Sequence, residues 1–177
     1  MSRRQGIRTA FVAACVATVL VGCENLEPTP AERAAVEQAA REYLGALAEA
    51  YSSLDPRPLQ AYATGSEIAA VSTLLRKLAG SGDRLEASLL QVDVDSIRVF
   101  REVNATVRLV EVWDVRRVDA YNGQEKGHNP RSVQSSIVQM RLIEGRWRVT
   151  ARQVQGVEGP HRWRVETPRP QATEDAG

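Results

Sequence analysis

The feature that most constrains the fold is a change of hydrophobic periodicity near Leu85. Before this point apolar residues recur every three or four positions, as in helices that bury one face. After it they alternate with polar residues, as in strands that are half-buried. Strands that follow one another through short turns pair antiparallel. The sequence therefore predicts an α+β fold in which N-terminal helices pack on an antiparallel sheet of four strands.

Three helices are expected in the first half of the chain. The segment Thr29-Pro30-Ala31-Glu32 has the pattern of a capping box with proline at the first helical position, which predicts a helix that runs to about Ser53. A short second helix is expected to begin at Asp55-Pro56. A third is expected to follow a cap at Ser66 and to end at Gly80-Ser81-Gly82-Asp83.

The alternating segments of the second half delimit the strands. We expect strands at about residues 86–100, 103–119, 132–144 and 146–155. Asn122-Gly123 and Gly127-His128-Asn129-Pro130 are expected in a long connection between the second and third strands, and Glu144-Gly145 in a tight turn before the fourth. The four strands therefore form a meander.

The N-terminus has the layout of an export signal. Three arginines precede an apolar stretch that ends in Leu20-Val21-Gly22-Cys23, and this segment is too short for a membrane-spanning helix. It resembles the lipobox of bacterial lipoproteins, which implies cleavage before Cys23 and acylation of that cysteine. The alternative is an uncleaved anchor that ends at Cys23.

These boundaries divide the chain into four parts. We expect a signal peptide over residues 1–22, a lipidated tether over 23–29, one domain over 30–155 and a flexible tail over 156–177. The tether is so short that the domain must lie against the lipid surface. The expected location is the cell envelope, on the extracytoplasmic side of a membrane.

Composition excludes several classes of function. Removal of residues 1–22 takes away three arginines and leaves 20 basic against 22 acidic residues, a balance without the excess positive charge of a nucleic-acid-binding protein. Cys15 leaves with the signal and Cys23 is consumed by lipidation. The two histidines, His128 and His161, lie in segments expected to be irregular. We therefore expect no catalytic residue, no metal and no cofactor beyond the diacylglycerol and N-acyl chains on Cys23.

The order of elements resembles a known fold. Helical segments followed by a sheet that closes on Gly145-Arg146-Trp147-Arg148-Val149 are similar to the cone-shaped nuclear transport factor 2-like fold, and within it to the intermembrane-space domain of plastid-division proteins and their cyanobacterial and bacterial relatives. The resemblance runs from about Val36 to Val154. It rests also on Leu89-Leu90-Gln91-Val92 and on Ala105-Thr106-Val107 leading to Glu111. It implies a curved sheet, and we expect this chain to differ from the family's usual setting in having a lipobox and no J-like or transmembrane part.

Glu111 is the residue of the predicted cone that most needs an explanation. Alternation places it, with Trp113, on the otherwise apolar face of the second strand, where an unpaired carboxylate is costly. One interpretation makes Glu111 a polar anchor or acid/base in a pocket. The other makes it structural, capping a helix end or pairing with an arginine such as Arg41 or Arg76, with Trp113 part of the core.

Two surfaces could bind partners. Val110 and Val112 form an apolar centre on the opposite face of the same strand, which suits a protein or dimer interface unless it is only solvated surface. In the tail, Trp163 lies between Arg162 and Arg164, as in an extra strand or a segment that touches lipid headgroups.

The favoured function is that of a non-catalytic, lipid-anchored module that binds a protein or peptide near the membrane, with homodimer formation as a further possibility. The alternative is a small-ligand-binding or enzymatic cone, similar to the SnoaL-like cyclases, in which Glu111 faces a pocket.

Overall fold

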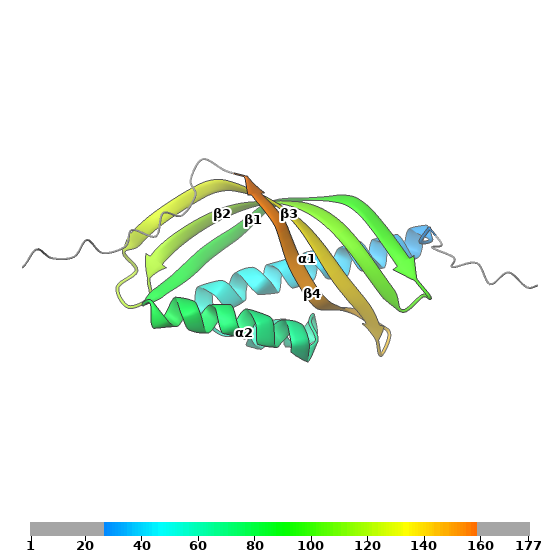
Figure 1. Cartoon of the computed structure of the whole chain (residues 1–177), viewed down its shortest axis with the longest axis horizontal. Coiled ribbons are helices and arrows are strands. Elements are labelled where there is room, and N and C mark those ends of the chain that lie inside the picture. The colour runs from blue at the N-terminus through cyan, green and yellow to red at the C-terminus, as the bar shows by residue number, and fades with distance from the viewer. Residues whose placement is uncertain (1–26, 159–177) are drawn as a thin grey trace, which may run out of the picture.

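The computed structural model describes residues 27–158, which form helices packed on one curved sheet. Figure 1 shows the sheet arching over the helices, and its strands follow the order β1-β2-β3-β4 with antiparallel pairing throughout. The elements are α1 (Pro30–Ser53), the 3₁₀ helix η1 (Arg57–Ala61), α2 (Gly65–Gly80), β1 (Asp83–Phe100), β2 (Asn104–Asp119), β3 (Glu125–Ile143) and β4 (Arg146–Glu158). This arrangement confirms the predicted α+β fold. The predicted signal peptide, Cys23 and Trp163 lie outside the described residues.

Helix α1 begins at the predicted capping box. The backbone N–H of Thr29 donates to Glu32 Oε2 at 2.8 Å, and the backbone N–H of Glu32 donates to Thr29 Oγ1 at 3.2 Å. These two bonds satisfy donors that the first turn of a helix leaves free. The helix ends at Ser53, as predicted, because Leu54 takes a left-handed conformation with φ of 56°.

The start of α2 is fixed by the edge of the sheet. The backbone N–H of Thr64 donates to the carbonyl of Val149 at 2.8 Å, and the N–H of Val149 donates to the carbonyl of Tyr62 at 2.8 Å. Thr64 therefore precedes the helix, and α2 begins at Gly65, one residue before the predicted cap at Ser66. The contact holds α2 against β4.

Strands β3 and β4 are longer than the sequence predicts. Residues 127–130, expected in a loop, belong to β3, which begins at Glu125 rather than at 132. The pairing of β2 with β3 shifts register at this point, so Pro130 occupies an irregularity in the ladder, where a residue without an N–H is tolerated. β4 continues to Glu158, which brings the first residues of the predicted tail into the sheet.

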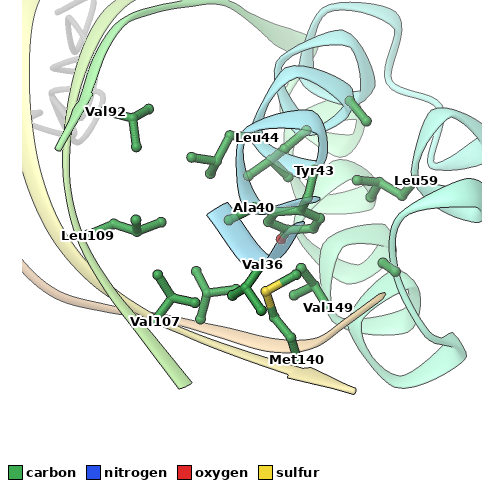
Figure 2. Packing of buried hydrophobic residues seen from close by; sticks show 14 of the residues in the cluster. Val36, Ala40, Tyr43, Leu44, Leu59, Val92, Val107, Leu109, Met140 and Val149 are labelled. Atoms are coloured by element: carbon green, nitrogen blue, oxygen red, sulfur yellow. The ribbon is translucent and has the colours of Figure 1, made fainter. Parts of the chain in front are cut away.

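The core lies between α1 and the concave face of the sheet. Figure 2 shows Tyr43 and Leu44 of α1 meeting Val107 and Leu109 of β2, with Met140 and Val149 from the neighbouring strands beside them. All six side chains are buried. Each buried side chain of this size contributes about 1.5–3 kcal/mol relative to exposure, so the packing of α1 on the sheet contributes substantially to the stability of the fold.

A charged cluster surrounds Asp83, at the end of the sheet where β1 begins and β2 ends. Its carboxylate accepts hydrogen bonds from Lys126 Nζ at 2.8 Å, Arg117 Nε at 2.8 Å and Ser81 Oγ at 2.8 Å. Burial alone would raise the pKa of Asp83, but these three donors outweigh it and lower the pKa to about 2. The cluster joins the end of α2 to β2 and β3.

Asp83→Asn is expected to destabilise the fold in a pH-dependent way. At pH 6 the variant should lose about 1.5–3 kcal/mol of unfolding free energy, the usual worth of hydrogen bonds to a charged group. Because the folded pKa is lowered, the stabilisation by Asp83 is complete above about pH 4 and is lost as the pH falls toward 2. Urea unfolding at pH 6 and pH 2.5 measures the difference from wild type, which should shrink at the lower pH. A constant difference, or an equal effect of Asp93→Asn at an exposed site, would contradict this account.

Candidate functional site

Glu111 lies on the concave face of β2 and is 0% exposed. In the sheet it pairs with Val92 of β1 and Gln134 of β3, so it occupies the middle of the ladder. Trp113, two residues along the same face, is 3% exposed and donates from Nε1 to Glu111 Oε2 at 2.7 Å. The structure therefore brings together the two residues that alternation placed on this face.

The charge partner of Glu111 is Arg152 of β4. Arg152 Nη2 lies 2.6 Å from Glu111 Oε2, and Arg152 Nε donates to Oε1 at 3.3 Å, so the guanidinium engages both carboxylate oxygens. Ser136 Oγ also donates to Oε1, and Arg152 Nη2 donates to Gln134 Oε1 at 3.1 Å. Three side chains from three strands, Trp113, Ser136 and Arg152, thus donate to one carboxylate.

The predicted partners Arg41 and Arg76 do not reach Glu111. Arg41 forms an ion pair with Glu37 one turn away and donates to the carbonyl of Val92 at 3.1 Å. Arg76 donates to Thr73 Oγ1 at 3.1 Å on α2. The prediction that an arginine pairs with Glu111 gave the right residue type, but these two identities were wrong.

A register shift in β4 places Arg152 on the concave face of the sheet, beside Glu111. Simple alternation from Arg146 and Arg148 places Arg152 beside them on the convex side. In the structure Val149 pairs with Met140 and Ala151 with Gln139, which leaves Thr150 as an extra residue. One extra residue inverts the facing of the residues up to the next register shift, after Val154, so Arg152 points inward.

A second carboxylate extends the network toward the helices. Glu67 of α2 is buried and accepts from Tyr43 OH at 2.5 Å and from the backbone N–H of Arg152 at 3.2 Å. Burial raises the pKa of Tyr43, and the charge and hydrogen bond of Glu67 raise it further. Burial likewise raises the pKa of the neighbouring Tyr51. Both phenols therefore stay protonated, and Tyr43 acts as a donor.

The geometry suits structural support better than catalysis. Burial would lower the pKa of Arg152, but its hydrogen bond to and attraction by Glu111 outweigh burial and raise it, so the guanidinium stays charged. Both oxygens of Glu111 accept hydrogen bonds, and a general base must have a free lone pair within reach of its substrate. The network instead links α1, α2, β2, β3 and β4. Within residues 27–158 no cluster of three or more His, Cys, Asp or Glu side chains could hold a metal ion.

Val110 and Val112 lie, by alternation, on the convex side of β2. Val112 is 7% exposed and Val110 is half-buried, so neither is the freely exposed apolar centre that the pattern suggested. His128, expected in an irregular segment, is part of β3 and contacts Asp114 through Nε2 at 2.6 Å. That contact holds the histidine on the side of the sheet away from Glu111.

An open groove of about 420 Å³ lies outside the core, between α1 and the β3–β4 hairpin. Its lining combines small and aromatic side chains with polar ones at the margins: Ala35, Gln38, Ala39, Glu42, Ala61, Tyr62, Gly145, Arg146 and Trp147. Of these, Trp147 and Tyr62 also pack against the core. No sequence pattern indicated the groove, because its walls come from three segments far apart in the chain.

Comparison with known proteins relates the chain to others by fold. No family model and no curated protein matches it. Among solved structures it is similar to the intermembrane-space region of the chloroplast protein ARC6, with 17% identity and a TM-score of 0.59 over 72% of this chain and 98% of that one. It also matches a protein of unknown function with a cystatin-like fold from Nostoc punctiforme (14% identity, TM-score 0.45, 75% and 96% covered) and Aln2 from a Streptomyces species (14%, 0.45, 73% and 93%).

The similarity to the ARC6 region agrees with the predicted resemblance at the level of the fold: helices on a four-stranded, curved antiparallel sheet. At this identity it establishes the architecture alone. Among residues 27–158, no helix is long and apolar enough to cross a membrane.

Proposed function

We propose that this protein is a lipid-anchored component of the cell envelope whose α+β domain binds a segment of a partner protein near the membrane surface. The observation that carries the proposal is the closed interior. Glu111, the one acidic residue on the apolar face of β2, is fully buried and bonded to Arg152, Trp113 and Ser136. Because the interior is closed, we place the binding of partners on the outer surface of the domain.

The groove between α1 and the β3–β4 hairpin is the proposed binding site. Its volume of about 420 Å³ falls within the range of sites that accept a few side chains. Alanines leave room over its floor, and Trp147 and Tyr62 offer flat apolar surface of the kind enriched at interfaces. Glu42 and Arg146 at the margin supply charges of both signs that can orient a bound segment.

The location of the groove supports a partner at the membrane. Ala35 lies in the second turn of α1, which begins seven residues after Cys23. If Cys23 carries the acyl chains, the intervening residues span at most about 25 Å. The groove would then lie close to the bilayer. The name of the similar ARC6 region also describes a compartment bounded by membranes.

The alternative, a ligand-binding or enzymatic cone with Glu111 in its pocket, is less favoured. It requires substrate to displace Arg152, Trp113 or Ser136 from the carboxylate inside a packed core.

Site-specific photo-cross-linking in cells tests the groove. With a photoreactive residue at the exposed position Gln38, we expect a discrete protein adduct. Ala35→Arg in the same chain should reduce its yield about tenfold or more, because a long charged side chain then occupies the site. The matched control is Ala34→Arg, at the adjacent exposed position of the same helix that does not line the groove, and it should leave the yield unchanged.

Two results would contradict the proposal: no protein adduct from Gln38, or equal loss of the adduct in both arginine variants. An adduct with the mass of two copies of this chain would identify the partner as a second copy.

A further inference from the structure

One end of the sheet carries a concentration of arginines. In the sheet, Phe100 pairs with Asn104, Asn104 with Arg141, and Arg141 with Arg148. Arg98 lies two residues before Phe100 on β1, and Arg108 lies four residues after Asn104 on β2. The arginine surface, as we name it, comprises Arg98, Arg101, Arg108, Arg141, Arg146 and Arg148. Among the described residues none of these six forms an ion pair, and the acidic residues of the two turns at this end are Glu102 and Glu144.

A depression of about 270 Å³ lies within this surface. Arg98 and Arg108 line it together with the hydroxyls of Ser96 and Thr106 and the amide of Asn104. Guanidinium groups next to hydroxyl and amide donors are the chemistry that binds phosphate oxygens. The depression therefore fits a phosphate group, and it offers no carboxylate that would repel one.

Two exposed apolar side chains lie at this end of the sheet, and one of them, Phe100, lines the depression. Phe100 is 39% exposed and Val103, in the β1–β2 turn, is 41% exposed. The guanidinium of Arg101 lies over the Phe100 ring, 5.1 Å from its centroid. An exposed aromatic ring among arginines is typical of protein surfaces that lie in a membrane interface, where the ring enters the headgroup layer and the cations meet phosphates.

The arginine surface lies at the end of the domain where α1 begins. In Figure 1 the start of α1, the β1–β2 turn and the β3–β4 turn are at the same end of the molecule. The two turns are tied together, because the backbone N–H of Leu142 donates to the carbonyl of Val103 at 2.8 Å. A chain anchored just before α1 therefore presents both turns to the bilayer.

We propose that the arginine surface docks on an anionic phospholipid bilayer, with a lipid phosphate between Arg98 and Arg108 and with Phe100 and Val103 in the interface. The overall charge does not produce this attraction, because residues 23–177 contain 20 basic and 22 acidic residues. The attraction comes from the placement of the arginines. This inference does not depend on lipidation or on the groove, although a lipid anchor would bring the surface to the membrane.

Vesicle co-sedimentation of the acyl-free chain from Glu24 to Gly177 tests the docking. This chain retains every element of the fold and the whole core, which lies between Val36 and Val149. We expect binding to vesicles of 30% phosphatidylglycerol in phosphatidylcholine and none to pure phosphatidylcholine. Arg98→Gln with Arg108→Gln should weaken the partition coefficient about 25-fold, because each basic residue near an anionic surface contributes about fivefold. Phe100→Ser should weaken it further.

The matched control is Arg116→Gln with Arg131→Gln, which removes two exposed arginines from the other end of the sheet and should leave binding unchanged. Thermal unfolding of each variant verifies its fold. Absence of binding to the anionic vesicles at low salt, or equal loss in both double variants, would overturn the proposal. Loss of vesicle binding on adding millimolar inorganic phosphate at constant ionic strength would also overturn it, in favour of a site for free phosphate. None of these outcomes affects the cross-linking test of the groove.

Discussion

Arg152→Ala should lower the free energy of unfolding by about 3–5 kcal/mol, the usual cost of removing one partner from a buried ion pair. The variant leaves the Glu111 carboxyl without its ion-pair partner at a position with 0% exposure, with only Trp113 and Ser136 to donate to it. It also removes the donor to Gln134. Urea unfolding followed by circular dichroism measures the loss.

The control for Arg152→Ala is Arg141→Ala, at an exposed position of β3, which should change stability by no more than about 0.5 kcal/mol. Arg152→Met combined with Glu111→Leu should recover much of the loss, because no unpaired charge then remains in the core. A cost below about 1 kcal/mol for Arg152→Ala would show that the pair has little structural role.

Cys23→Ala should abolish lipidation completely and leave the signal uncleaved. Only the thiol of the cysteine at the processing site can accept the diacylglyceryl group that the resemblance to bacterial lipoproteins implies. Metabolic labelling with a palmitate analogue should therefore show no label on the variant, which should also migrate as a larger species. Cys15→Ala, which removes the other cysteine of the chain, should label normally. Equal labelling of wild type and Cys23→Ala would disprove the lipoprotein assignment.

Local sequence signals predicted most of the fold. The capping box at Thr29 fixes the start of α1 through contacts between residues three positions apart, so the start of this helix can be predicted without the structure. Strict alternation along β2 correctly placed Glu111 and Trp113 on the buried face. These signals succeed because they depend on neighbours in the chain.

Features that depend on pairing between distant strands could not be predicted. The extra residue at Thr150 turns Arg152 inward, and nothing in the sequence of β4 indicates this register shift. The irregularity around Pro130 lets a turn-like sequence continue as strand β3. The same limit applies to the groove and to the arginine surface. The residues of the arginine surface become neighbours only when the sheet forms, and those of the groove only when α1 and η1 also pack against it.

We propose that the interior of the cone provides stability while the outer surface provides function. The variant Glu111→Gln tests the contribution of the interior to stability separately from binding at the outer surface. The amide keeps some hydrogen bonds but loses the charge opposite Arg152, so the fold should persist with a melting temperature lower by about 2–8 °C.

The most direct test combines this variant with the photoreactive residue at Gln38. Below the melting transition, the account predicts that Glu111→Gln gives the same yield of partner adduct as the unsubstituted chain, together with the lower melting temperature. An unchanged melting temperature with a lost adduct would contradict it, and would place function at Glu111 in the interior of the cone.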